Sequence, residues 1–78
     1  MTVTEVLPRI AASLDVDPNE IGMDTIFQDV RGWDSISTMS LVLLLYKEFD
    51  LKLGPHETSM LTSVPDVIQL LRDAGKIE

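Results

Sequence analysis

Asp34 and Ser35 are the side chains best placed for chemistry, because they stand where a long loop meets the start of a predicted helix. Alone, a Ser at such a place is an ordinary helix cap. A helix N-terminus also offers free N–H groups and the positive end of the helix dipole, which stabilise an attached anion by about 0.3–1 kcal/mol. The residues leave both interpretations open, a plain cap and the anchor of an anionic group. The carboxylate of Asp34 is either a second cap or an aid to chemistry at the hydroxyl.

Other kinds of chemistry find little support in the residues. The chain has no Cys and one His, His56, which falls in a Gly-Pro-His-Glu turn, so we expect no metal site. Its four glycines are isolated and form no phosphate-binding loop. No pair of carboxylates stands out as acid and base, and no motif frames a nucleophile. We therefore expect a protein that is not an enzyme.

Length, charge and hydropathy limit the possible partners. The 78 residues predict a single domain, residues 1–78, and we expect a monomer. The net charge of −7 disfavours nucleic acid and favours partners with a basic patch. The longest apolar run, Leu41 to Tyr46, is too short to span a membrane, and the N-terminus lacks the layout of a signal peptide. These features predict a cytoplasmic protein.

Apolar residues recur at helical spacing in three places, whereas strand-like alternation is absent. The first helix is expected over about residues 2–14, with a start near Thr4 that would make Pro8 tolerable. Its apolar stripe comprises Val3, Leu7, Ile10 and Leu14. The second helix should run over residues 35–49. The last should begin after Ser63 as cap, with Asp66 completing a capping box, and end before Gly75.

Two further stretches complete the expected fold. A long first loop spans residues 15–34, with one helical turn at Asp17-Pro18-Asn19-Glu20 and a bend at Gly32. The loop residues expected to anchor in the core are Ile21, Ile26, Phe27 and Val30. Residues 54–61 allow a short helix after Gly54-Pro55. The sequence therefore predicts an all-α fold: a small bundle of three main helices plus one short helix.

The second helix carries more apolar surface than one core contact requires. One apolar arc consists of Leu41, Val42, Leu45 and Phe49, and a second arc consists of Ile36, Met39, Leu43 and Tyr46. Together the arcs span about 220° of the helix surface at 100° per residue, against a stripe of about 100° for a helix packed on one core. Either the helix is packed on both sides, or one arc faces the core and the other meets a partner.

The run Gly32-Trp33-Asp34-Ser35-Ile36, followed by a Leu- and Val-rich helix, resembles the acyl carrier proteins, whose attachment motif is Asp-Ser-Leu at the start of the second helix. The resemblance covers nearly the whole chain. It includes Phe27 in the long loop, Glu48-Phe49-Asp50 at the end of the second helix, and Thr62-Ser63-Val64 before the last one.

The resemblance implies a carrier of covalently bound cargo. A phosphopantetheinyl transferase would esterify Ser35 with 4′-phosphopantetheine from coenzyme A, with Asp34 in support. The thiol of the arm would hold an acyl group as a thioester and present it to synthases or acyltransferases in fatty-acid, polyketide or specialised lipid biosynthesis; an aminoacyl cargo is an alternative. Acyl chains can tuck among the helices in this family. The expected lining here is Leu41, Leu45, Leu61 and Ile68.

The chain departs from the family pattern along the second helix. Housekeeping carriers bear acidic residues there, which dock on basic enzyme patches, whereas this chain has Ser37, Ser40, Tyr46 and Lys47. We expect partners to contact Ile36, Met39, Ser40, Leu43, Tyr46 and Lys47. This more apolar face, and Trp33 before the motif, favour a dedicated pathway over bulk fatty-acid synthesis. The apolar face also leaves open a second function, a protein-interaction module without a prosthetic group.

Overall fold

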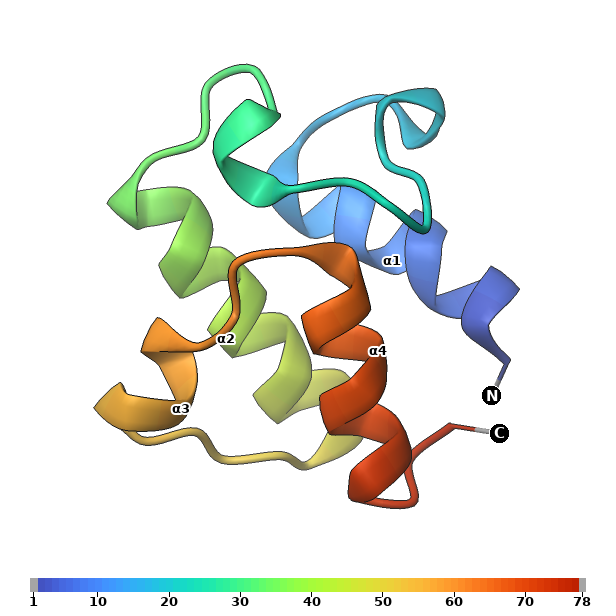
Figure 1. Cartoon of the computed structure of the whole chain (residues 1–78), viewed down its shortest axis with the longest axis vertical. Helices are drawn as coiled ribbons and strands as arrows, with labels where there is room; N and C mark the ends of the chain where they lie inside the picture. The colour runs from blue at the N-terminus through green and yellow to red at the C-terminus, as the bar shows by residue number, and fades with distance from the viewer. Residues whose placement is uncertain (1, 78) are drawn as a thin grey trace.

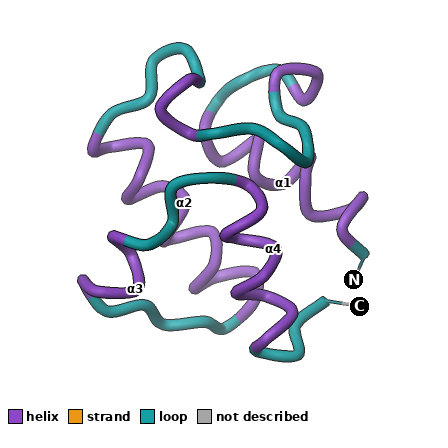
Figure 2. Tube along the Cα trace, in the orientation of Figure 1, coloured by secondary structure: helices purple, strands orange, loops and turns teal. Residues whose placement is uncertain are grey.

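Three long helices and one short helix make up the fold in the computed structural model, which describes residues 2–77 (Figure 1). They are α1 (Val3–Leu14), α2 (Ser35–Phe49), α3 (Pro55–Ser59) and α4 (Val64–Asp73). The first loop contains two single 3₁₀ turns, Pro18–Glu20 and Phe27–Asp29. Figure 2 shows helices joined by loops, with no strand in the part of the chain that is drawn as described. The predicted all-α bundle is confirmed. None of the described helices is long and apolar enough to cross a membrane.

The start of α1 lies one residue before the expected position. Thr2 caps the helix, and the Glu5 carboxylate accepts hydrogen bonds from the Thr2 backbone N–H (3.3 Å) and hydroxyl (3.1 Å). Pro8 consequently lies in the second turn, where it removes one backbone hydrogen bond. The ring of Pro8 is exposed and does not pack in the core. The helix is stabilised by the side chains that it buries, Val6, Ile10 and Ala11.

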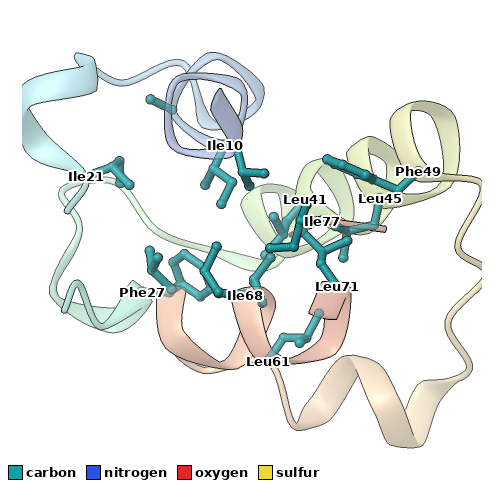
Figure 3. Packing of buried hydrophobic residues seen from close by; sticks show 14 residues of the cluster. Ile10, Ile21, Phe27, Leu41, Leu45, Phe49, Leu61, Ile68, Leu71 and Ile77 are labelled. Atoms are coloured by element: carbon teal, nitrogen blue, oxygen red, sulfur yellow. The ribbon is translucent and has the colours of Figure 1, made fainter. Parts of the chain in front are cut away.

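The core lies between α1, α2 and α4. Figure 3 shows Ile10, Leu45 and Leu71 converging from these three helices. The buried apolar side chains are Val6, Ile10, Ala11, Ile21, Phe27, Leu41, Leu45, Phe49, Leu61, Val64, Val67, Ile68, Leu71 and Ile77. The stripe expected on α1 faces the core, with Ile10 fully buried and Val3, Leu7 and Leu14 partly buried and packed against the core cluster. The most deeply buried residues of α1 are Val6, Ile10 and Ala11. Only Ile10 belongs to the expected stripe, so the centre of the buried side of α1 is rotated from the expected one.

The first loop is pinned to the segment that precedes α4. The Phe27 N–H donates to the Thr62 carbonyl (3.0 Å), and the Val64 N–H donates to the Thr25 carbonyl (2.8 Å). Ile21 and Phe27 are buried as expected, and Val30 is half-buried. The expectation for Ile26 was wrong, since its side chain is 50% exposed. Ile26 forms an extended bridge with Ser63, and successive side chains of extended backbone point to opposite sides.

The N-terminus of α4 is capped as predicted, with one difference. The Ser63 hydroxyl accepts from the Asp66 N–H (3.3 Å). The Asp66 carboxylate does not close a capping box on Ser63. It reaches one residue further back and accepts from the N–H (3.0 Å) and the hydroxyl (2.8 Å) of Thr62. These hydrogen bonds, first that of the Thr62 hydroxyl, hold the pKa of Asp66 below its usual value.

Candidate functional site

Ser35 is the first residue of α2 and lies at the end of the long loop, where the ribbon of Figure 1 turns from loop to green helix. Its side chain is exposed, and within residues 2–77 its hydroxyl has no hydrogen-bond partner. The interpretation of Ser35 as a plain cap was wrong, because Asp34 is the cap of α2. The structure therefore leaves the Ser35 hydroxyl available to react.

The carboxylate of Asp34 is hydrogen-bonded to the first turn of α2. Its Oδ1 accepts hydrogen bonds from the Ser37 N–H (2.9 Å) and from the Ser37 hydroxyl (3.1 Å). The Ser37 backbone N–H, and then its hydroxyl, hold the pKa of the Asp34 carboxyl below its usual value. Asp34 is thus ionised at neutral pH beside Ser35. Both hydrogen bonds use the same one of its two carboxylate oxygens.

The approach to Ser35 is shaped by an aromatic pair that sequence reasoning missed. Gly32 makes the expected bend, with φ +79°, and the Trp33 N–H donates to the Val30 carbonyl (3.1 Å). The indole of Trp33 stacks on the ring of Phe27, with 4.8 Å between ring centroids and 10° between ring planes. Phe27 is buried, so the stack ties the residue two positions before Ser35 to the core. The aromatic types were visible in the sequence, but their contact depends on the path of the loop.

The second apolar arc of α2 faces outward. The exposed fractions of Ile36, Met39, Leu43 and Tyr46 are 71%, 70%, 48% and 46%. Lys47 is also exposed, and Ser40 is half-buried. The first arc lies in the core, apart from Val42, which is half-buried. The interpretation of α2 as a helix packed on both sides was wrong. The structure brings the six expected partner-binding residues onto the helix that begins at Ser35.

A groove of about 1090 Å³ follows this exposed arc. The outward-facing side chains of α2 between Ile36 and Tyr46 supply one wall, and side chains from residues 52–62 supply the other. Trp33 and Phe27 lie among the lining residues next to the start of α2. Tyr46 and Lys52 line the groove near the C-terminal end of α2, away from Ser35. There the Lys52 ammonium is 5.9 Å from the centroid of the Tyr46 ring.

Only part of the expected lining of an acyl site faces this groove. Leu61 lines it, whereas Leu41, Leu45 and Ile68 belong to the buried core. Apolar type and helical spacing do not distinguish a core residue from a groove residue. The groove exists because residues 52–62 pack beside α2 without covering it, which no local pattern reveals.

Comparison with known proteins gives the family. A family model described as a phosphopantetheine attachment site matches residues 4–71. An acyl carrier protein of Clostridium acetobutylicum is 33% identical over 72 residues, which are 92% of this chain and 94% of the relative. The chain belongs to the acyl carrier protein family. An acyl carrier protein of Bdellovibrio bacteriovorus is similar to it as well, at 34% identity over 67 residues and 86% of each chain. The resemblance stated from the motif is confirmed.

The acyl carrier protein family brings 4′-phosphopantetheine as its prosthetic group, and the residues around Ser35 fit that group. The Ser35 hydroxyl is exposed, and the first N–H groups of a helix attract an anionic phosphodiester. The groove is lined by Trp33, two residues before Ser35, and by Ile36, directly after it. An arm attached at Ser35 would therefore have an apolar surface at its root.

Proposed function

We propose that this chain is a carrier without catalytic activity of its own, which holds acyl intermediates as thioesters on a 4′-phosphopantetheine arm attached to Ser35. The observation that supports Ser35 most directly is its exposed, unbonded hydroxyl at the start of α2 in a chain of the acyl carrier protein family. The arm, when attached, supplies the thiol that the cysteine-free chain lacks.

The chain's own residues have three tasks in this proposal. The Ser35 oxygen gives up its proton and bonds to the phosphorus of coenzyme A that carries pantetheine. The pyrophosphate P–O bond of coenzyme A breaks, and adenosine 3′,5′-bisphosphate leaves. Asp34 holds the first turn of α2, so that the hydroxyl stays at a fixed place on the surface. The fold keeps the tethered cargo near each docked enzyme, which raises its effective concentration without new contacts.

Mass spectrometry after incubation with coenzyme A and a broad-specificity phosphopantetheinyl transferase tests the attachment. We expect one phosphopantetheine adduct on the wild-type chain, mapped to Ser35, and none on Ser35→Ala. The matched control is Ser59→Ala, which removes the hydroxyl of an exposed serine in α3. No adduct on the wild type, or an adduct that persists on Ser35→Ala, would contradict the proposal.

We further propose that partner enzymes dock on the exposed face of α2. The residues of this docking face are Ile36, Met39, Ser40, Leu43, Tyr46 and Lys47. Contiguous apolar side chains on a small protein mark interaction surfaces, and four members of this face are 46–71% exposed. Between Asp34 and Glu48, α2 bears no carboxylate. The docking face therefore supports a contact with the transferase, synthases or acyltransferases that is more apolar than acidic.

A charge placed on the docking face tests this contact. Met39→Glu and Leu43→Glu should each lower kcat/KM for loading at least about tenfold, because an unpaired carboxylate would be buried at the interface. Gln69→Glu, at an exposed position of α4, adds the same charge away from the docking face and should load at the wild-type rate. Equal rates for all three variants would remove α2 as the docking surface.

The exposed apolar arc also supports the second candidate, an interaction module that needs no prosthetic group. The two candidates differ in a complementation assay. The carrier requires that Ser35→Ala be inactive while remaining folded. The interaction module requires that Ser35→Ala be active and that Met39→Glu be inactive.

The cargo and setting belong to the proposal as well. The missing acidic residues on α2 favour a dedicated polyketide, specialised lipid or aminoacyl pathway over bulk fatty-acid synthesis. The mass of the protein purified from its native source would identify the cargo. A single domain over residues 1–78, a monomeric state and a cytoplasmic location stay predictions.

A further inference from the structure

Trp33 occupies an unusual place between the core and the groove. It is the one tryptophan of the chain. One face of its indole stacks on Phe27, which is only 1% exposed. The residue as a whole is half-buried and contributes to the lining of the groove. Within residues 2–77 the indole N–H donates to no protein acceptor. The indole therefore keeps both an apolar surface and a hydrogen-bond donor for a ligand.

The groove leads away from Ser35 along α2. Lining residues recur on α2 from Ile36 to Tyr46. With a rise of 1.5 Å per residue, the eleven steps from Ser35 to Tyr46 cover about 17 Å. An arm that leaves Ser35 can extend into water or lie along this length. The second path buries apolar surface of the arm against apolar side chains, and so lowers the free energy of that path.

We infer that Trp33 is a positioning residue for the prosthetic arm: its indole, held on Phe27, forms the wall at the root of the arm and directs the arm into the groove along α2. The inference rests on the proposed attachment at Ser35. A side chain stacked on a buried ring cannot swing away without breaking the stack, so the wall is preorganised. The free indole N–H can donate to an amide carbonyl of the arm.

Intrinsic fluorescence tests the inference directly, because Trp33 is the sole source of tryptophan emission. The probes are coenzyme A and octanoyl-coenzyme A, each loaded by a broad-specificity transferase and verified by mass. On loading we expect a blue shift of emission and a loss of about half the acrylamide quenching, since the arm covers part of the exposed surface of the indole. Ser35→Ala in the same mixture should show neither change.

The outcomes separate the inference from the proposed function. Absence of an adduct by mass contradicts attachment at Ser35. A complete adduct with unchanged emission and quenching overturns the positioning role while leaving the carrier function intact.

A second readout excludes a merely structural role for Trp33. Amide chemical-shift differences between the loaded and unloaded protein should follow the groove at Thr38, Tyr46 and Leu53. Trp33→Phe, which keeps an aromatic ring to stack on Phe27, should retain this pattern. Trp33→Ala should lose most of it. The inference is wrong if a folded Trp33→Ala keeps the wild-type pattern. Should Trp33→Ala fail to fold, the wild-type quenching result and Trp33→Phe decide the question.

Discussion

Asp34 caps α2 through one carboxylate oxygen, and its neighbour Ser35 is thereby left with a free hydroxyl. These different roles of Asp34 and Ser35 follow from where α2 begins. The cap position is taken by the residue whose side chain reaches the N–H of Ser37, and the next residue begins the helix with its side chain in water. A serine that served as its own cap would have its oxygen engaged. At this site the carboxylate of Asp34 caps the helix, and the Ser35 hydroxyl stays exposed and unbonded, as the proposed attachment requires.

The second carboxylate oxygen of Asp34 leads to a prediction about loading. An ionised carboxylate beside Ser35 can orient the hydroxyl or help place a metal ion in the transferase complex. Asp34→Asn keeps an acceptor for the Ser37 N–H but removes the charge. We expect it to load several-fold more slowly with only a small fall in melting temperature, and Asp34→Ala to lose both rate and more of its melting temperature, because it also loses the cap.

Asp29→Asn is the control, because it neutralises an exposed carboxylate in the preceding 3₁₀ turn. Loading rates and melting temperatures of the three variants are compared at neutral pH. A wild-type loading rate for Asp34→Asn would limit Asp34 to its capping role.

As an element, α2 is divided lengthwise into a core side and a docking side. Leu45 is fully buried, whereas Leu43, two residues before it, is 48% exposed. The same truncation should therefore have unequal effects. Leu45→Ala should lower the free energy of unfolding by about 2–5 kcal/mol, because it leaves a cavity. Leu43→Ala should change it by less than about 1 kcal/mol.

Urea unfolding measures both values, and the two variants control for each other because they remove the same atoms from the same helix. Similar losses would mean that the docking side is packed as well. If Leu43→Ala alone slows loading while it leaves stability nearly unchanged, the division of α2 by side is supported.

The elements also show how far the sequence could predict this fold. The bounds of α2 and the start of α4 were predictable, because the signals of Asp34 and Ser63 are local. The orientation of Ile26 was not, since it depends on a bridge to Ser63, far along the chain. The same holds for the groove, which requires residues 52–62 to pack beside α2. The motif alone was enough to propose Ser35, which stays a prediction, but the Trp33–Phe27 stack beside it could not be predicted.

Across the whole molecule, the negative charge lies mostly away from the docking face. The chain carries 13 acidic residues, and only one of them, Glu48, lies within α2. Glu48 forms an exposed ion pair with Arg9 of α1. The net charge of −7 can attract a basic enzyme over distance, while the proposed contact on the docking face would be made by apolar side chains. We therefore expect salt to slow association with a partner more than it weakens the final complex.

Two hydrogen-bonded carboxylates at helix starts, Asp34 and Asp66, give the whole fold a pH dependence. The pKa values of Asp34 and Asp66 are lowered in the folded chain by the hydrogen bonds they accept. A lowered folded pKa adds stability above the unfolded value, near 3.9, and that stability is lost as the pH falls through the folded value. We therefore expect the melting temperature to be level from about pH 7 to 5 and to fall below about pH 4.

The Asp34→Asn/Asp66→Asn double variant tests whether these two groups cause the fall. It should start from a lower melting temperature at pH 7 and lose less of it below about pH 4 than the wild type does. The control is a Glu20→Gln/Asp24→Asn double variant, which also removes two negative charges, but from exposed positions of the first loop. Both double variants remove two negative charges. A difference between their plots of melting temperature against pH is therefore due to the hydrogen bonds of Asp34 and Asp66 and not to overall charge repulsion. Parallel curves for the two double variants would refute a specific role of Asp34 and Asp66 in acid stability.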